Sequence, residues 1–267
     1  MTLARAAQLN FQGTRLLESR DYRAANRALC ESAAIVGGLE IVEQEDLPEL
    51  EAWEEAEASG EDEMETTATT AMSLSFGPDI PALKDHEFFI FNRCLLFQEE
   101  KVAAALPLSE EQKRLYAATV MINMAIGCHA LAKEVGKDSH LRKALHLYGL
   151  SLDLLWDGPH REEEEEHEDE DDHDDCLDVL VIAALNNMAN IHYQMGALPA
   201  AKQLLETAKP LLSDLSEEWA DLFPVDECYL NYVVTSFSTT ARSAWNTQNT
   251  KTELHFSSAI FFILGFP

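Results

Sequence analysis

The sequence predicts an all-α protein in which helical hairpins are interrupted by two acidic stretches. Three parts of the 267-residue chain carry apolar residues at helical spacing, each with a turn signal near its middle. Of the 48 acidic residues, 13 lie in residues 40–65 and 12 in residues 162–175, and neither stretch contains Lys or Arg. Most of the formal net charge of −29 therefore resides outside the predicted helical faces.

The clearest hairpin lies in residues 177–213. Its first helix is predicted from apolar residues that recur at intervals of three and four, namely Leu180, Ala184, Met188, Ile191 and Met195. Gly196 ends this helix, because glycine adopts the left-handed conformation that a helix C-terminus favours. A second helix follows, with an inward face made by Ala201, Leu204, Leu205 and Ala208. The small alanines allow two antiparallel helices to approach closely.

This spacing resembles the tetratricopeptide repeat (TPR). Members of that family place a large residue before a small one, here Met188 and Ala189, and an aromatic residue soon after, here Tyr193. The turn glycine and the two alanines seven residues apart, Ala201 and Ala208, complete the pattern over one 34-residue unit. The resemblance implies a superhelix of stacked helical hairpins.

Two other parts of the chain fit the same template. Near the N-terminus, Gln12–Gly13 is the large–small pair and a turn follows at Arg20–Asp21, where the aspartate can cap the next helix. In the middle of the chain, Met124–Ala125 is the pair and Ala144 lies on the second helix. Ala125 and Ala144 stand 19 residues apart, whereas Ala189 and Ala201 stand 12 apart. We therefore expect this hairpin to be longer by about one turn on each helix.

The resemblance implies a TPR-like αα-hairpin superhelix of about three repeats plus a capping helix from about Ser216 to Thr235. The overall pattern, over residues 5–240, is similar to TPR-like diatom families that carry acidic insertions. The expected organisation is a first hairpin (1–36), an acidic disordered insertion (37–80), an aromatic segment with the second hairpin (81–157), an acidic disordered loop (158–176), the third hairpin with the capping helix (177–245) and a poorly ordered tail (246–267).

Residues 85–97, "DHEFFIFNRCLLF", are aromatic and only weakly alternating. A short strand pair and an apolar plug under the acidic loop both fit this pattern.

Several functions are excluded or disfavoured by the sequence. No basic surface is available to release counterions from nucleic acid, and no nucleophile elbow, phosphate-binding glycine loop or His-Glu-x-x-His motif occurs. We therefore expect no enzyme activity, no cofactor and no metal site. The five dispersed cysteines indicate reduced thiols, and neither a signal peptide nor a membrane-spanning apolar run is evident. A cytoplasmic location follows, with the nucleus as the alternative.

The two acidic stretches differ in kind. Residues 162–175 form a low-complexity run in which self-repulsion favours a solvated loop over a defined metal site. Residues 40–65 include Leu47, Leu50 and Trp53 in a helix-prone background. Trp53 is a candidate anchor for a partner, and equally a tether of the insertion to its own scaffold.

Asparagines are the other candidate partner-binding residues. Asn123 and Asn187 each precede their unit's large–small pair, a place where some TPR superhelices carry asparagines that bond a peptide backbone, and Asn186 and Asn190 extend that face. Phe11 occupies the matching place in the first unit, so the sequence predicts a ladder of two rungs. Asparagines that bond a neighbouring helix are the structural alternative.

The predicted function is a non-catalytic protein–protein interaction scaffold that binds a protein or peptide on the concave TPR face and favours basic partners. An acidic C-terminal peptide is an unexpected ligand, because residues 176–195 contain no Lys or Arg. The alternative is an acidic protein similar to the interrupted-TPR histone chaperones, which also combine TPR helices with long acidic insertions. No nuclear localisation cluster accompanies that layout.

Overall fold

The computed structural model describes residues 3–37, 74–83, 88–97, 109–156, 171–215 and 224–248. This part of the chain is mostly helical, as the sequence predicts, and it also contains one two-stranded sheet. Its elements, in chain order, are α1 (Leu3–Glu18), α2 (Tyr22–Gly37), β1 (Leu74–Asp79), the short 3₁₀ turn η2 (Pro81–Leu83), β2 (Arg93–Phe97), α4 (Glu110–Val135), α5 (Asp138–Trp156), α6 (Asp171–Gln194), α7 (Leu198–Asp214) and α9 (Val225–Gln248).

Six helices form three consecutive pairs, α1 with α2, α4 with α5 and α6 with α7. Each pair is joined by a turn that contains a residue with positive φ: Arg20 (φ 66°), Gly136 (φ 65°) and Gly196 (φ 77°). Asp21 begins α2 as expected, since its Oδ1 accepts a hydrogen bond from the backbone N–H of Ala24 at 3.2 Å. The turns are two or three residues long, so the helices of each pair run antiparallel along each other.

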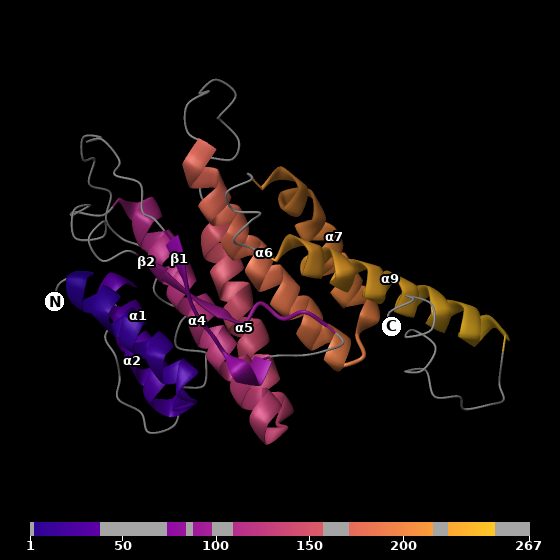
Figure 1. The fold of residues 1–267 in the computed structure, drawn as a ribbon, viewed down its shortest axis with the longest axis horizontal. Helices are drawn as coiled ribbons and strands as arrows, with labels where there is room; N and C mark the ends of the chain where they lie inside the picture. The colour runs from indigo at the N-terminus through magenta and orange to yellow at the C-terminus, as the bar shows by residue number, and fades with distance from the viewer. Residues whose placement is uncertain are drawn as a thin grey trace.

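The pairs lie in a row, because α2 packs against α4, α5 against α6 and α7 against α9 (Figure 1). Two glycines allow close approach at one end of this row. A Cβ added to Gly13 of α1 would lie 2.6 Å from Cγ of Leu29 in α2, and one added to Gly127 of α4 would lie 2.7 Å from Cδ2 of Leu17 in α1. The predicted small residue of the first unit, Gly13, therefore lies at a contact that tolerates no side chain.

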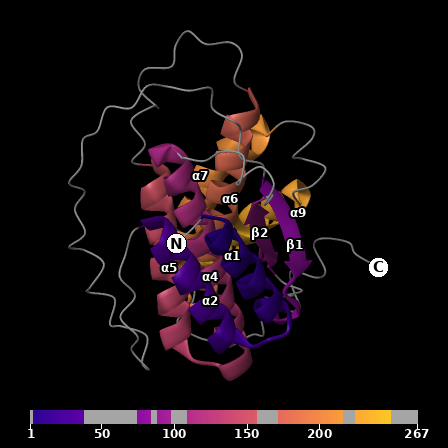
Figure 2. The ribbon, with the colours of Figure 1, turned by 90° about the vertical axis from the view of Figure 1, so that its left-hand side faces the viewer.

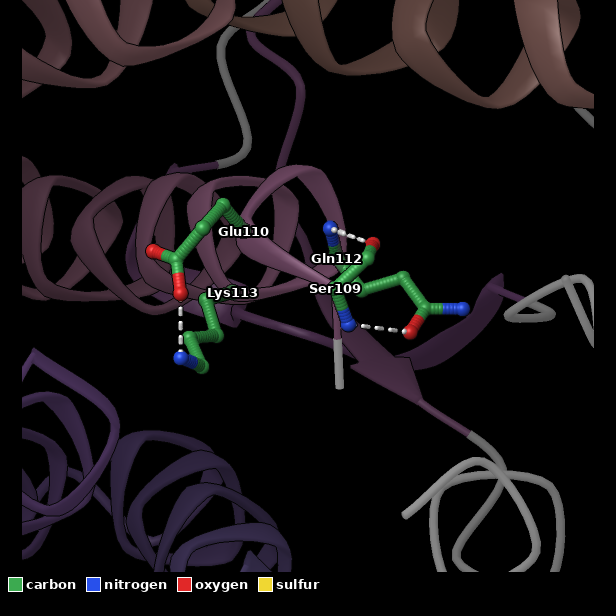
Figure 3. A network of polar contacts seen from close by, with 4 residues as sticks. All are labelled: Ser109, Glu110, Gln112 and Lys113. Atoms are coloured by element: carbon green, nitrogen blue, oxygen red, sulfur yellow. Dashed lines mark hydrogen bonds and ion pairs between the residues drawn. The ribbon is translucent and has the colours of Figure 1, made fainter. Parts of the chain in front are cut away.

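Helix α4 is the core helix of the described part of the chain. It is long and apolar enough to cross a bilayer by length and composition, but most of its residues are buried by other elements, as in the central helix of a globular protein. A capping box begins it: Oγ of Ser109 accepts from the Gln112 N–H at 3.1 Å, and Oε1 of Gln112 accepts from the Ser109 N–H at 3.0 Å (Figure 3). The adjacent Glu110–Lys113 ion pair lies on the exposed side of the same turn.

The strands β1 and β2 pair antiparallel, with Leu74 opposite Phe97 and Phe76 opposite Leu95. They lie on one side of the row of helices, close to α1, while α5 lies on the opposite side (Figure 2). Of the two alternatives for residues 85–97, the strand pair is therefore the one observed, although its first strand comes from residues 74–79. An irregularity between Phe76 and Asp79 interrupts the pairing.

Several boundaries differ from those predicted. Strand β1 lies in the stretch assigned to an acidic insertion (37–80), because its apolar residues Leu74 and Phe76 pair with β2. Helix α6 begins at Asp171, inside the predicted acidic loop (158–176), and helix N-termini favour acidic residues because of the macrodipole. Helix α9 begins only after Pro224 and continues to Gln248, past the predicted start of the tail.

The hairpin of α4 and α5 is longer than that of α6 and α7, with helices of 26 and 19 residues against 24 and 17, so the direction of the prediction is confirmed but the excess is smaller than one turn on each helix. The other residues predicted as disordered lie outside the part of the chain that the structure describes.

Candidate functional site

Residues 88–97 cross the helices as an extended segment, here called the clamped segment. In Figure 1 this purple stretch passes from the side of α1 and α4 toward α6. Asparagine side chains from helices α1, α4, α6 and α9 bind its backbone, and the sides of these helices that carry them are here called the asparagine face.

The first contact is at Leu95. Oδ1 of Asn123, in α4, accepts from the Leu95 N–H at 2.8 Å, and Nδ2 of Asn123 donates to the Leu95 carbonyl at 2.7 Å. The second hydrogen of Asn123 Nδ2 serves Oδ1 of Asn10 in α1, at 3.0 Å. Asn10 in turn approaches the same carbonyl at 3.4 Å. Both helices are thereby tied to one residue of the segment.

The second contact is at Phe91. Oδ1 of Asn187, in α6, accepts from the Phe91 N–H at 2.7 Å, and Nδ2 donates to the Phe91 carbonyl at 2.9 Å. The same Nδ2 donates to the hydroxyl of Tyr148 in α5 at 2.9 Å. The N–H and C=O of Phe91 fix the amide of Asn187 in one orientation, and burial raises the pKa of Tyr148, so its hydroxyl stays protonated near neutral pH.

The third contact is at Phe89. Oδ1 of Asn231, in α9, accepts from the Phe89 N–H, and Nδ2 donates to the Phe89 carbonyl, both at 2.7 Å. Asn231 also donates to Oδ1 of Asn186 at 2.7 Å, and Asn186 donates to the Phe89 carbonyl at 3.2 Å. Asn123, Asn187 and Asn231 therefore each use Oδ1 and both amide hydrogens, which is at least three of the four hydrogen bonds that an asparagine side chain can make.

Phe89, Phe91 and Leu95 are separated by even numbers of residues, so their backbone groups point to the same edge of an extended chain. The other edge faces β1: the carbonyl of Asn92 accepts from the Ile80 N–H at 2.7 Å, and that of Leu96 accepts from Oγ of Ser75 at 3.3 Å. The clamped segment thus lies between the asparagine face on one edge and β1 with its following residue on the other.

The side chains of the clamped segment are mostly buried. The Phe88 ring lies 5.3 Å from that of Tyr193, and the Phe91 ring meets that of Phe76 edge-on at 5.8 Å. Its one charged residue, Arg93, is exposed and pairs with Asp79 of β1 at 3.0 Å. The other buried side chains of the segment are those of Ile90, Cys94 and Leu95.

The structure brings together the predicted residues Asn123, Asn186 and Asn187, all fully buried, on one segment of their own chain. Each of the three also bonds a side chain of another helix, as the structural alternative predicts: Asn123 bonds Asn10, Asn187 bonds Tyr148 and Asn186 bonds Asn231. Asn190 lies on the same face of α6 and is 1% exposed. Its Oδ1 accepts from Gln194 at 2.6 Å, while its Nδ2 has no hydrogen-bond partner among the described residues. Trp53 lies outside those residues.

The prediction of a ladder with two rungs is corrected, because Asn10 and Asn231 extend it to four helices. Asn10 was not predicted, because the residue compared between the hairpins is the one directly before the large–small pair. In the first hairpin that residue is Phe11, which is 55% exposed, and Asn10 lies one residue earlier. Asn231 lies in the helix predicted only as a cap. A search for an inward-facing asparagine on each alternate helix would have found both.

Several cysteine thiols are buried in the described structure. Burial raises the pKa of Cys94 and Cys228, and that of Cys128 to about 11, so these thiols remain protonated near neutral pH. The described residues contain no group of three His, Cys, Asp or Glu side chains placed to hold a metal ion. The arrangement is therefore suited to holding an extended backbone by hydrogen bonds.

No protein-family model matches the chain, and neither the curated proteins nor the solved structures include a significant match.

Proposed function

We propose that the chain is a non-catalytic protein–protein interaction scaffold of the TPR type, with the asparagine face as its peptide-binding surface. One observation carries this proposal: asparagines from four helices hold an extended segment by its backbone groups. A surface that satisfies both the N–H and the C=O of alternate residues has the chemistry that recognises an extended peptide. Attachment at three residues, here Leu95, Phe91 and Phe89, also fixes the direction of that peptide.

Charge supports a preference for basic partners. The chain has a formal net charge of −29, concentrated in residues 40–65 and 162–175. Such charge attracts basic proteins at long range and increases their rate of association. The preference should weaken as salt rises, because surface charges are screened over about 10 Å at 0.1 M ionic strength.

Asn190→Ala is the variant that tests the binding surface. Asn190 contributes no hydrogen bond to the clamped segment, so its replacement should leave the fold intact. Immobilised wild-type and variant chains are incubated with an extract of the native cell, and the retained proteins are compared by quantitative mass spectrometry. We expect Asn190→Ala to lose at least tenfold of a specific partner, with unchanged circular dichroism.

Gln203→Ala is the matched control, because Gln203 is an exposed amide on α7. It should retain the partner. Equal recovery by wild type and Asn190→Ala would show that the partner does not bind at the part of the asparagine face around Asn190.

The acidic stretches favour a second candidate, an acidic histone-chaperone-like protein of the interrupted-TPR type. Residues 162–170 contain eight acidic residues and precede α6, so replacing them with a Gly/Ser run of equal length removes charge and leaves the helix complete. This candidate predicts a large loss of affinity for purified core histones in that variant. Unchanged affinity would exclude a role for this stretch.

A further inference from the structure

We propose that the clamped segment is an exchangeable internal ligand, and that the asparagine face binds in trans an extended peptide of the same pattern. The trans peptide would carry apolar residues at the positions of Phe88, Ile90, Phe91 and Leu95, and a basic residue at that of Arg93. This inference rests on the proposed function and specifies the chemistry of its partner.

The hydrogen bonds from these asparagines to the clamped segment all go to backbone atoms. Asn123, Asn187 and Asn231 each bind the N–H and the C=O of one residue. These groups are the same in every non-proline residue, so the hydrogen bonds are available to any extended chain that enters in the same register. The asparagine face therefore does not require the clamped segment in particular.

Side-chain contacts supply the selectivity. Phe88 belongs to a buried apolar cluster with Ala189, Ala201 and Leu205, its ring packs on that of Tyr193, and Phe91 packs edge-on against Phe76. A peptide with small or charged residues at these positions would leave the contacts empty or bury a charge, and either is costly. The surface thus selects aromatic or large aliphatic residues.

Charge adds a preference for a basic residue at the position of Arg93. Arg93 is the only charged residue of the clamped segment, and Asp79 pairs with it at 3.0 Å. The pair is exposed, so it contributes little stability, but it favours a basic residue over an acidic one at this position. The acidic composition of the whole chain favours a basic peptide as well.

The row of helices is held together by direct contacts between helices, without the clamped segment between them. The helix pairs contact one another directly, through α2 with α4 and through α5 with α6. The seventh helix, α9, packs on the last pair through α7. The clamped segment lies between the first and second pairs in the sequence and belongs to neither. It can be replaced by an equivalent peptide without breaking any of these three helix contacts.

Asn190 provides an independent indication of an incomplete fit. Its Nδ2 is buried and lacks a hydrogen-bond partner among the described residues, and a buried donor without a partner destabilises a folded protein. Asn190 lies one turn from Asn186 and Asn187, between Ala189 and Tyr193, which belong to the same apolar cluster as Phe88. A peptide whose carbonyl reached this amide would have an advantage over the clamped segment.

The internal ligand is favoured because it is covalently attached, with an effective concentration on the order of millimolar for flexible linkage. A variant with a weaker segment is therefore needed to reveal binding in trans. Phe91→Ala in the full chain keeps the backbone contacts and removes a buried ring. The probe is a fluorescent synthetic peptide of residues 86–99, and binding is followed by fluorescence anisotropy under reducing conditions.

We expect Phe91→Ala to bind this peptide at least tenfold more tightly than wild type does. The same peptide N-methylated at the residue that corresponds to Phe91 is the matched control, because it keeps every side chain and cannot donate to Asn187. Its affinity should fall at least tenfold. Equal binding of both peptides would show nonspecific hydrophobic association and overturn the proposal.

Hydrogen exchange of the wild-type chain tests exchangeability if Phe91→Ala does not fold. The proposal requires the amides of Phe89, Phe91 and Leu95 to exchange through a local opening, faster than the central amides of α4. Exchange of all three only by global unfolding would make the segment a permanent part of the core and overturn the proposal. That result would leave the scaffold function standing if Asn190→Ala still lost its partner.

A second copy of the chain is the other possible occupant of the asparagine face, and sedimentation distinguishes it from a separate partner. Its segment would enter the asparagine face by exchange between two chains. Wild type that sediments as a dimer and dissociates on addition of the peptide would identify this occupant, and would overturn the assignment of a separate partner.

Discussion

Asn231 and Phe89 lie 142 residues apart in the sequence and exchange two hydrogen bonds of 2.7 Å. Through this contact the last described helix, α9, is joined directly to the clamped segment that precedes the second helix pair. Asn186 joins the same carbonyl and also accepts from Asn231. The three residues form a connected polar network in which each group depends on the others for its partner.

Asn231→Asp should destabilise the protein strongly near neutral pH. The carboxylate keeps the acceptor for the Phe89 N–H but places negative charge against the Phe89 carbonyl and Oδ1 of Asn186. We expect a loss on the order of 2–4 kcal/mol in the free energy of unfolding, measured by urea denaturation at pH 7.

Acid should partly rescue Asn231→Asp. A carboxyl forced to be neutral has a folded-state pKa above its unfolded value, so its stabilising protonated form is complete below the unfolded pKa and is lost as pH rises. The deficit relative to wild type should therefore shrink between pH 7 and pH 4. Gln203→Glu, an exposed change of the same type, should show no such dependence; a deficit that is constant with pH would contradict the network.

Gly127→Ala should destabilise the contact between α4 and α1. The added Cβ would lie 2.7 Å from Cδ2 of Leu17, which is itself fully buried and has little room to move. We expect a cost of about 1–3 kcal/mol, measured by thermal or urea unfolding. Gly149→Ala in α5 is the matched control, because nothing lies within 4 Å of its added Cβ.

Helix propensity predicts that Gly149→Ala stabilises the protein by roughly 0.5–1 kcal/mol. Opposite signs for the two glycines are therefore expected. A stabilising effect of Gly127→Ala would show that α1 and α4 are farther apart than described.

Ser109→Ala should remove the capping box at the start of α4. Its hydroxyl accepts from the Gln112 N–H, so the substitution should cost about 1 kcal/mol in the free energy of unfolding. Lys113→Ala, in the same turn, removes an exposed ion pair and should cost only a few tenths of a kcal/mol. An equal loss of stability in both variants would contradict the larger contribution assigned to the capping box.

Alkaline pH should lower the stability of the folded chain. Burial raises the pKa of Cys128 from 9.0 to about 11, so the folded state holds this proton more tightly than the unfolded state. Its contribution is complete below pH 9 and is lost as pH rises toward 11. We expect the free energy of unfolding to fall between pH 9 and pH 10.5 under reducing conditions.

Cys128→Ala separates this thiol from other groups. Tyr116, whose pKa burial raises to about 12, should contribute at still higher pH in both proteins. The slope of stability against pH between 9 and 10.5 should be shallower in Cys128→Ala than in wild type. Identical slopes would show that Cys128 does not titrate in the unfolding reaction.

The local pattern predicted the helices well. Gly196 ends α6 and Asp21 caps α2, since helix termination depends on the backbone preferences of single residues and their neighbours. The alanine spacing around Ala125 and Ala144 predicted the longer α4 and α5 for the same reason. Strand β1 was missed because a strand depends on a partner, and its partner β2 lies about twenty residues away.

The candidate site was predicted only in part. Asn123 and Asn187 were identified from their place before a large–small pair, which is a local signal. Asn10 and Asn231 were not, because their role depends on the distance between helices far apart in the chain. The occupant of the asparagine face lies within residues 85–97, which the sequence predicted as a short strand pair or an apolar plug under the acidic loop and did not connect with the asparagines.

By itself, the sequence determined the helical nature of the protein and the confinement of most of its negative charge to two stretches, because periodicity and composition are local properties. Only the tertiary structure decided that the asparagines of α1, α4, α6 and α9 meet on one extended segment. The physical reason is that an amide side chain can bond any backbone within reach, and only the packed helices decide which backbone that is.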